Sequence, residues 1–471
     1  MQFDITSSPN TVSASNPQAY SRLNDVRLKD ISIVSPNGTD MSIMNQYAIL
    51  QIHEDIFQNN LSGVVSNIDA SNIVVNFPLT GEEFLMITFE TPGSGDTIEL
   101  AFIIDKILDR APLRNNQSQF YDIHFVCPTF TCNLFSDVSK AYNTTISSMV
   151  SDIFKNNINA GGADSTRKEL KTNEKTFGEQ NVIIPSWNAF TSINWLSRRA
   201  VSETNQKICD YVFYQDLDGF HFRSISSMFD GEPMQTYIYG VDNSIDFVRD
   251  TPNSEIDMQK SFQNIRKLAA GGFDRSKETM KGAYASSVLV HDMVTKSYDE
   301  TDYKYLDDFD QKPSLNGNPI MPKNHMYSDK TNARGHFVPS HLNLYGEPSQ
   351  SEENSGNDGV EIWLPRHEAQ LCMLQSSHIE IEVAGDSSRR VGDKVFALVN
   401  SFEGVDEQGR VKNDTSATGN YIITRITHTI HKTVGHTMQM QLCKESNMNS
   451  TPQNLSFDSN VLPSGTGNIL S

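Results

Sequence analysis

The stretch IEVAGDSSRRVGDKVFALV, residues 381–399, indicates how this chain folds. Apolar and polar residues alternate along it, and Gly385-Asp386 and Gly392-Asp393 interrupt the alternation. Alternation with period two is typical of half-buried β-strands, and Gly-Asp pairs are typical of the turns between them. The stretch offers no obvious catalytic side chain, so we interpret it as a hairpin that builds a wall rather than an active site. The side chains expected to pack inward are Val383, Val395, Ala397 and Val399.

Short strands of the same kind occur near both ends of the chain. Residues 23–126 contain runs such as YAILQIHEDIF and IELAFIIDKIL, separated by turn signals such as Pro36-Asn37-Gly38. From about residue 361 to residue 445 the strand pattern returns. Regular short strands with such punctuation favour a β-sandwich or a β-barrel. We therefore expect two β-regions that flank a different middle part.

The middle part mixes helical and strand patterns. FSDVSKAYNTTISSMVSDIFKNNI (135–158) and MQKSFQNIRKLAAG (258–271) predict helices, and IPSWNAFTSINWLSRRAVS (184–202) predicts a further helix capped by Ser186. DYVFYQDLDGFHFRSIS (210–226) predicts a hairpin that turns at Asp218-Gly219. The middle is thus expected to be an α+β unit.

Composition narrows the possible functions. A chain of 471 residues predicts two to four domains, and its net charge of −20 argues against a general affinity for nucleic acid. Five scattered cysteines indicate reduced thiols and production in the cytosol. The chain has no run of about 18 apolar residues, so we expect no membrane insertion.

Two patterns could point to metal sites, and we interpret neither as one. His428, His431 and His436 cluster near the C-terminal end, but no acidic or cysteine ligand lies at a recognisable spacing, so we read them as the polar face of a strand. DLDG (216–219) resembles the start of a calcium loop, yet Ser227 stands where the twelfth-position glutamate belongs. The usual hydrolase, zinc-protease and phosphate-loop motifs are absent. We expect no metal, no cofactor and no catalytic site.

Five motifs in order resemble one family of structural proteins. They are YAILQIHEDIFQNNLSGVVSNIDASNIVVNFPLTGEEFLMITFETP (47–92), IPSWNAFTSINWLSRRAVS with the hairpin that follows it (184–229), GAYASSVLVHDMVTKSYDETDYKYLDDF (282–309), VAGDSSRRVGDKVFALV (383–399) and GNYIITRITHTI (419–430). Together they resemble the baseplate central hub protein of contractile-tailed, T-even-like bacteriophages, which is related to the hub part of type VI secretion spike proteins. The resemblance covers residues 23–445.

The resemblance implies a fold that is mainly β with an α+β middle. Two tube-like antiparallel β-barrel domains would line a trimeric, pseudo-sixfold ring. The implied domains are an N-terminal extended arm (1–22), a first tube-like domain (23–128), a middle domain with acidic loops (129–232 and 276–360), a second tube-like domain (233–275 and 361–446) and a flexible C-terminal tail (447–471). The loops near 310–325 and 346–359 are additions to the family pattern.

The implied function is structural. The homotrimer would adapt the hexameric tail tube, or its initiator protein, to the trimeric, tail-lysozyme-like spike, and it would also contact baseplate wedge proteins. Genomic DNA would pass through its channel without specific binding, and part of the negative charge would face that lumen. The protein would be made in the bacterial cytoplasm and reside in the virion baseplate.

Interface residues follow from the resemblance motifs. The residues expected at interfaces are Glu54, Asp55, Gly63, Gly81, Glu82, Glu83, Gly385, Gly392, Asp393, Gly419 and Tyr421. One alternative remains, a tail-associated cell-wall hydrolase whose active site would lie between residues 127 and 345, the only part large enough to hold it.

Overall fold

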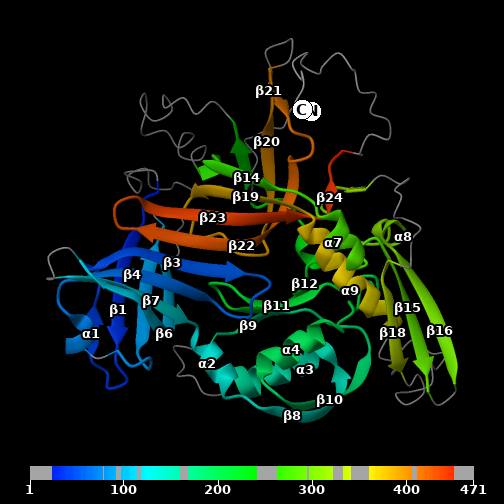
Figure 1. Cartoon of the computed structure of the whole chain (residues 1–471), viewed down its shortest axis with the longest axis horizontal. Coiled ribbons are helices and arrows are strands. Elements are labelled where there is room, and N and C mark those ends of the chain that lie inside the picture. The colour runs from blue at the N-terminus through cyan, green and yellow to red at the C-terminus, as the bar shows by residue number, and fades with distance from the viewer. Residues whose placement is uncertain are drawn as a thin grey trace, which may run out of the picture.

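The computed structural model describes residues 24–77, 79–91, 97–113, 118–159, 168–240, 262–293, 296–321, 333–340, 360–405 and 411–449. The predicted arm (1–22), the loop 346–359 and nearly all of the predicted tail lie outside these residues. The described chain is mainly β, as predicted, and its largest sheet has 14 strands. Figure 1 shows this sheet across the upper and left parts of the molecule, with helices and smaller sheets below and to the right.

Seven strands near the N-terminus form what we call the first module. They are β1 (Arg27–Val34), β2 (Asp40–Ser42), β3 (Tyr47–Asp55), β4 (Ser62–Asp69), β5 (Phe84–Glu90), β6 (Thr97–Pro112) and β7 (Gln119–Val126), with the short helix α1 (Ile73–Asn76) after β4. Seven further strands form the second module. They are β13 (Thr236–Tyr239), β14 (Lys267–Gly271), β19 (Ser377–Ala384), β20 (Lys394–Val405), β21 (Val411–Asn413), β22 (Gly419–His431) and β23 (Gly435–Lys444).

The two modules have the same strand order. Six strands of the first run β1-β5-β6-β7-β4-β3, and six of the second run β13-β20-β22-β23-β19-β14. If the six strands of each module are numbered from 1 to 6 in chain order, their order across the sheet is 1-4-5-6-3-2 in both modules. The pairings are antiparallel in both modules except at one place, where β13 runs parallel to β20 while β1 runs antiparallel to β5. The chain therefore builds one topology twice.

A shared irregularity aligns the modules residue by residue. The pairing of β6 with β7 shifts register between Ile104 and Lys106, and the pairing of β22 with β23 shifts between Ile423 and Arg425. A register shift of this kind is a β-bulge, which places two residues opposite one. The bulge makes Lys106 of β6 the counterpart of Arg425 of β22.

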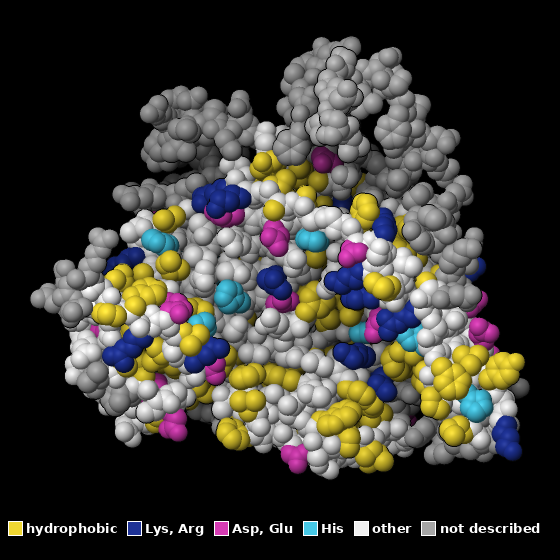
Figure 2. All heavy atoms as spheres, viewed as in Figure 1, with side chains coloured by type: hydrophobic (Ala, Val, Ile, Leu, Met, Phe, Trp, Pro, Cys, Tyr) yellow, Lys and Arg dark blue, Asp and Glu magenta, His cyan; other side chains and the backbone are white. Residues whose placement is uncertain are grey.

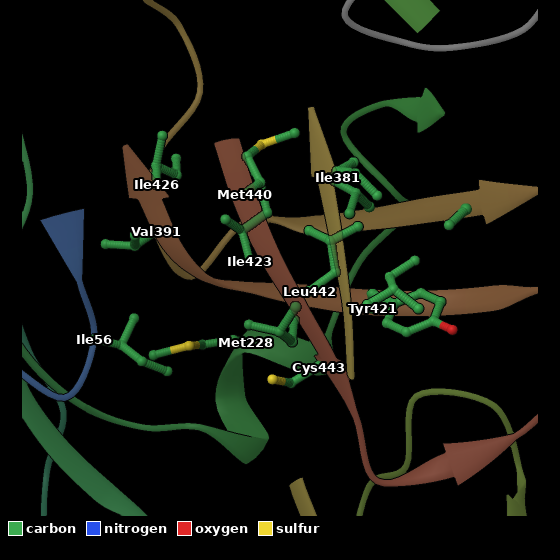
Figure 3. Close-up of a cluster of buried hydrophobic side chains, with 14 of the residues drawn as sticks. Ile56, Met228, Ile381, Val391, Tyr421, Ile423, Ile426, Met440, Leu442 and Cys443 are labelled. Carbon is green, nitrogen blue, oxygen red and sulfur yellow. The ribbon is translucent and has the colours of Figure 1, made fainter. Parts of the chain in front are cut away.

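Each module buries one face of its strands around its own core. The second core gathers side chains from β19, β20, β22 and β23 (Figure 3). Val383, Val395, Ala397 and Val399 are all buried, as predicted. The predicted hairpin is wrong, however, because β19 pairs with β14 and β23, whereas β20 pairs with β13, β21 and β22. The hairpin β22–β23 inserts between them, since periodicity specifies the buried face of a strand but not its neighbour.

Strand pairing does not close either module into a barrel within the described residues. One backbone hydrogen bond draws the ends of each sheet together at equivalent places. In the first module Ile43 N–H donates to the carbonyl of Ile31, and in the second Ile265 N–H donates to the carbonyl of Ile238. Each module is thus a strongly curved sheet.

The modules join edge to edge into one sheet. Strand β3 of the first module pairs antiparallel with the second half of β22, from Asp55 opposite Arg425 to Ile49 opposite His431. The paired residues of β3 and β22 are at least 370 positions apart in sequence, so this pairing brings the two ends of the described chain together. Figure 1 shows the blue strand β3 beside the orange strand β22.

The remaining elements pack below and beside the large sheet. From residue 127 to residue 229 they are α2 (Pro128–Leu134), β8 (Val138–Thr145), α3 (Ile146–Ile153), the π-helix η1 (Phe154–Ile158), β9 (Leu170–Asn173), β10 (Glu179–Trp187), α4 (Ala189–Ser197), β11 (Tyr211–Gln215), β12 (Phe220–Ser224) and the 3-10 helix η3 (Ser226–Phe229). From residue 275 onward they are α7 (Arg275–Met280), β15 (Ala285–Asp292), β16 (Ser297–Lys304), α8 (Tyr305–Phe309), β17 (Asn318–Pro319), β18 (Gly335–Ser340), α9 (Val360–Gln375) and β24 (Ser446–Asn447).

Several local predictions for the middle part need correction. The helix predicted for residues 135–158 is strand β8 followed by α3 and η1. The next helix begins at Ala189, and its cap is Asn188, whose side chain accepts a hydrogen bond from the N–H of Thr191, rather than Ser186. The hairpin at Asp218-Gly219 is confirmed. These errors arise because tertiary pairing with β10 outweighs the helical spacing in β8.

Two corrections concern the second β-region. Residues 267–271 of the predicted helix 258–271 form strand β14, and residues 258–261 lie outside the described residues. The predicted strand pattern after residue 361 begins instead as helix α9, which packs against β15, β16, β19 and β23. No described helix has the length and apolar character needed to cross a membrane. All five cysteines are free thiols.

Candidate interface site at the junction of the two modules

The junction of the modules carries an ion pair on the exposed side of the sheet. Arg425 of β22 donates from Nε and Nη2 to the Oδ2 atom of Asp55 of β3, at 3.0 and 2.9 Å. The other oxygen of Asp55 accepts a hydrogen bond from the N–H of Phe57 at 2.8 Å. The carboxylate therefore holds β22 on one side and shapes the turn after β3 on the other.

A buried chain of three side chains lies just beneath this ion pair. The Oε1 atom of Glu54 lies 2.9 Å from Nε2 of His428, and Nδ1 of His428 lies 3.1 Å from Nε2 of His436. All three side chains have zero solvent exposure. The chain links β3, β22 and β23, so it crosses the boundary between the modules.

Burial makes this chain neutral at ordinary pH. Burial raises the pKa of Glu54 to about 8, against the opposing attraction of Arg390. Burial lowers the pKa of His428 to about 3, helped by the positive charge of Arg390, and lowers the pKa of His436 to about 3, helped by His428. A protonated Glu54 can donate to His428, which can donate in turn to His436. The arrangement thus holds the strands together without placing a net charge in the interior.

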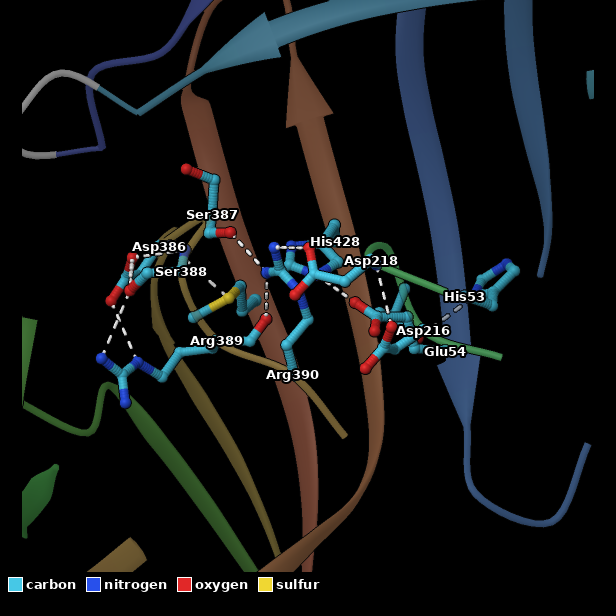
Figure 4. A network of polar contacts seen from close by, with 12 residues as sticks. His53, Glu54, Asp216, Asp218, Asp386, Ser387, Ser388, Arg389, Arg390 and His428 are labelled. Atoms are coloured by element: carbon cyan, nitrogen blue, oxygen red, sulfur yellow. Dashed lines mark hydrogen bonds and ion pairs between the residues drawn. The ribbon is translucent and has the colours of Figure 1, made fainter. Parts of the chain in front are cut away.

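The loop between β19 and β20 adds a second polar layer to the junction (Figure 4). Arg390 donates from Nη2 to Oδ1 of Asp218 at 2.8 Å and from Nη1 to the carbonyl of Ser387. Asp218 lies in the β11–β12 turn, where Asp216 accepts hydrogen bonds from two backbone N–H groups and faces His221 at 2.9 Å. Arg390 therefore connects the second module to the middle part.

The same loop is held internally by two carboxylates. Asp386 accepts hydrogen bonds from the N–H and hydroxyl of Ser388 and lies 3.2 Å from Nε of Arg389. Asp393 accepts from the N–H of Arg390 at 3.1 Å. Burial raises the pKa of Asp393 to about 6, although Arg389 opposes the shift. These contacts fix the loop in the shape that presents Arg390 to the β11–β12 turn.

Three of the predicted glycines have identifiable physical roles. A Cβ atom on Gly385 would lie 2.0 Å from Cγ of His436, and one on Gly63 would lie 2.2 Å from the carbonyl oxygen of Gln51. Both glycines therefore allow close packing, rather than a turn as we expected for Gly385. Gly392 has φ of +90°, a conformation that favours glycine, so it does serve a turn.

The predicted interface residues fall into three groups. Six lie at or beside the junction, and they are Glu54, Asp55, Gly63, Gly385, Gly392 and Asp393. Gly81, Glu82 and Glu83 lie before β5, where Glu83 accepts hydrogen bonds from the N–H groups of Thr80 and Gly81. Gly419 and Tyr421 open β22, and the hydroxyl of the buried Tyr421 donates to the carbonyl of Ala417. The structure thus assigns contacts within one chain to most of them, and their role between chains stays a prediction.

The interpretation of the histidines as a polar strand face is wrong for two of them. His428 and His436 are buried and in contact, whereas His431 is partly exposed and accepts a hydrogen bond from the N–H of Thr433 at 3.1 Å. A sequence signal existed for His428, because it lies between Ile426 and Ile430 at period two. No comparable signal marks Arg390 or Asp218, since their contact joins distant loops.

The side of the large sheet opposite the two cores is mostly polar over the second module and mixed over the first, and we call it the outward face. From β14 across to β6 it carries Lys267, Ala269, His378, Glu380, Glu382, Gln439, Gln441, Arg425, Thr427, Thr429, Ile49, Gln51, His53, Asp55, Ser62, Val64, Ser66, Ile68, His124, Asp122, Phe120, Val126, Lys106 and Leu108. Over β14, β19, β23 and β22 this face is hollowed into a groove of 470 Å³. The outward face is therefore continuous across both modules and concave over the second.

Charges on the outward face are sparse and nearly balanced. Its acidic side chains are Asp55, Glu380, Glu382 and Asp122, and its basic side chains are Lys267, Arg425 and Lys106. Figure 2, seen from the same direction as Figure 1, likewise shows side chains of both signs interspersed rather than gathered in blocks. Hydroxyl, amide and imidazole groups make up most of the rest. This surface offers phosphate groups no basic cluster.

Three buried or partly buried carboxylates of the middle part, where a hydrolase site would lie, have structural partners. Asp210 accepts hydrogen bonds from the N–H and hydroxyl of Ser226, and Glu174 accepts from Ser224. Asp308 lies 2.6 Å from Nε of Arg366. Each of these carboxylates thus fixes one element against another.

Comparison with known proteins finds similarity in structure alone. No family model matches the chain, and no curated protein matches it. A tail protein from Neisseria meningitidis MC58 superposes with a TM-score of 0.50 and 11% identity, over 88% of this chain and 96% of that one. The 43 kDa tail protein of prophage MuSo2 from Shewanella oneidensis superposes with a TM-score of 0.49 and 9% identity, over 88% and 98% of the two chains.

A third solved structure is a component of the type VI secretion system of E. coli, described as similar to T4 bacteriophage tail proteins. It superposes with a TM-score of 0.41 and 10% identity, over 90% of this chain and 77% of that one. At such low identities the likeness to the Neisseria protein establishes the fold and nothing more. The resemblance to tail proteins expected from the sequence is thereby confirmed at the level of the fold.

Proposed function

We propose that this protein is a structural hub of a contractile phage-type tail. In this role a homotrimer adapts the six subunits of the tail tube to the three subunits of the cell-puncturing spike. The observation that carries the proposal is that one chain builds the same six-strand topology twice and joins the two copies laterally in a single sheet. Three such chains present six equivalent units to a tube and three identical chains to a spike.

The outward face lines the channel in this arrangement. It is continuous across both modules, and over the second it is mostly polar and hollowed, as suits the wall of a water-filled tube. The nearly balanced charges of this face modify the expectation of an acidic lumen. DNA passes because the wall lacks a basic cluster that would hold phosphate, and not because dense carboxylates repel it. The excess negative charge then lies mostly on other surfaces.

The partners follow from this position in the tail. The trimer binds the spike on one end, the tube or its initiator on the other, and wedge proteins at its periphery. The protein resides in the virion baseplate after synthesis in the bacterial cytoplasm. The strands β15, β16 and β18 lie on the side away from the β3–β22 junction (Figure 1), where peripheral partners can reach them.

Mass measurement by light scattering tests the proposal. The purified chain, alone and mixed with its cognate spike, is expected to give the mass of three copies, with or without three spike chains. Electron microscopy of that particle should show a ring with six similar lobes. A chain that stays monomeric with the spike and tube proteins present would contradict the adapter role.

Incubation with bacterial cell-wall sacculi tests the hydrolase alternative. We expect no clearing of the suspension and no release of soluble muropeptides. Clearing that disappears when a single carboxylate of the middle part, such as Glu203, is replaced by its amide would show instead that this part is enzymatic.

A further inference from the structure

When the two modules are aligned, two strand edges in the described part of the chain have no pairing partner, although the equivalent edges in the other module pair with each other. Within one chain, β3 of the first module pairs with the second half of β22. By strand order, the counterpart of β3 in the second module is β14, and the counterpart of β22 in the first module is β6. Among the described residues β14 pairs with β19 only, and the second half of β6 pairs with β7 only.

Both of these edges are exposed and carry apolar side chains. Seven of the eight residues from Asp105 to Pro112 are exposed, and Leu108 retains 42% of its accessible surface. Near β14, Phe273 is 65% exposed. An exposed strand edge presents unpaired N–H and C=O groups and tends to bind another strand, and an apolar side chain beside it favours a protein partner.

We propose that the edge of β14 pairs antiparallel with the second half of β6 in a second copy of this chain. This contact repeats between chains the β3–β22 contact that joins the modules within a chain. The inference rests on the proposed function, because it names the surfaces through which the ring closes. Such a contact is heterologous, one edge of each copy binding the other edge of the next, so it generates a closed ring where the rotation between copies closes and an open filament where it does not.

The alignment also specifies the register. On β6, Leu108 is the counterpart of Thr427, because Lys106 is the counterpart of Arg425, and Thr427 lies opposite His53 of β3. On β14, Gly271 is the counterpart of His53. This follows because His53 lies opposite Ser62, the counterpart of Ser62 is His378, and His378 lies opposite Gly271. Leu108 of one copy is therefore expected opposite Gly271 of the next. Ala269, two residues along β14 on the same face, is then a diagonal neighbour of Leu108.

Cysteine cross-linking tests this register. The full chain carries Leu108→Cys and Ala269→Cys, with the half-buried Cys132 replaced by serine, and is treated with a short bis-maleimide. Diagonal neighbours lie roughly 7–8 Å apart, within reach of that reagent. In one chain the two positions are seven strand spacings apart, about 34 Å along the sheet, which disfavours a link within a copy. We expect covalent dimers and trimers, with no product larger than three chains.

The matched control pairs Leu108→Cys with Tyr298→Cys, because Tyr298 is 72% exposed on the edge strand β16 of a different sheet. This pair should give no trimers. Equal products from both pairs would overturn the edge pairing, even if light scattering shows a trimer, and the hub role would then stand by itself. Specific Leu108–Ala269 products from a chain that is otherwise monomeric would support the edge pairing and count against the stable ring.

Charge exchange gives a second readout that does not depend on cysteine chemistry. Leu108→Asp with Ala269→Asp should weaken self-association several-fold, because like charges meet across the two strands. Leu108→Lys with Ala269→Asp should restore it. Failure of the opposite charges to rescue association, with both variants folded by circular dichroism, would contradict the register.

Discussion

Arg425 and Asp55 form an ion pair across the boundary of the two modules, with 2.9 Å between Nη2 and Oδ2. The two residues are 370 positions apart in sequence, and the strands that carry them hold the first module to the second. The arginine is half exposed and the carboxylate is nearly buried. The ion pair therefore contributes to the stability of the contact between the two modules.

Replacement of Arg425 by alanine is expected to destabilise the junction modestly. The nearly buried carboxylate of Asp55 loses two charge-assisted hydrogen bonds, which costs about 1–2 kcal/mol after allowance for solvent screening of the arginine. Differential scanning calorimetry should show a lower midpoint of thermal unfolding. Lys267→Ala is the matched control, since Lys267 pairs with Glu382 at an exposed position and its loss should change the midpoint little.

Replacement of Gly385 by alanine should be more damaging. The new Cβ atom would lie 2.0 Å from the buried ring of His436, so the ring must move and the Glu54–His428–His436 chain must break. Overpacking of this kind costs about 1–3 kcal/mol. Gly272→Ala, where a Cβ meets nothing within 4 Å, is the control for the glycine change itself. Similar unfolding midpoints for the two variants would show that the histidine ring relaxes freely.

Stability should depend on pH in two opposite ways. His428 and His436 have folded pKa values of about 3, below their ordinary value of 6.5, so an unfolded chain binds protons that the folded chain does not, and stability rises from pH 4 to about pH 6.5. Glu54 has a folded pKa of about 8, above its ordinary value of 4.5, so its contribution falls as pH rises towards 8.

The variant Glu54→Gln separates the two effects. The amide keeps the shape of the protonated carboxyl and can donate to His428, but it does not titrate. The unfolding midpoint of this variant should no longer decline between pH 6.5 and pH 8, while its rise below pH 6.5 should persist. Persistence of the decline in the variant would assign it to another group.

Charge reversal on the outward face should convert it into a surface that binds DNA. Glu380→Lys with Glu382→Lys places two new cations beside Lys267 and Arg425 along the groove. Filter binding should detect DNA retention that weakens steeply with salt, whereas the wild-type chain should retain little. Asp299→Lys with Glu300→Lys on β16 changes the net charge equally, away from the groove. Equal retention by both variants would show that total charge, and not the outward face, controls DNA binding.

Local patterns in the sequence identified much of the fold. Period two placed Val383, Val395, Ala397 and Val399 in a core, and the Asp218-Gly219 pair located a hairpin, because each signal depends only on residues close in sequence. The mixed middle part and the β-rich ends followed from the same patterns. The sequence resemblance to tail hub proteins anticipated the fold that the Neisseria structure shares.

The tertiary structure decided which strands are neighbours and which polar residues are buried. Alternation shows which face of a strand is apolar, but every strand edge offers the same N–H and C=O groups. The sequence therefore could not show that β19 and β20 are not neighbours in the sheet. His428 and His436 look polar in sequence and lie in the interior, because Glu54 reaches them from a strand about 370 residues away. The chain alone therefore determined two β-rich units, and only the packing of the whole molecule joined them through β3 and β22.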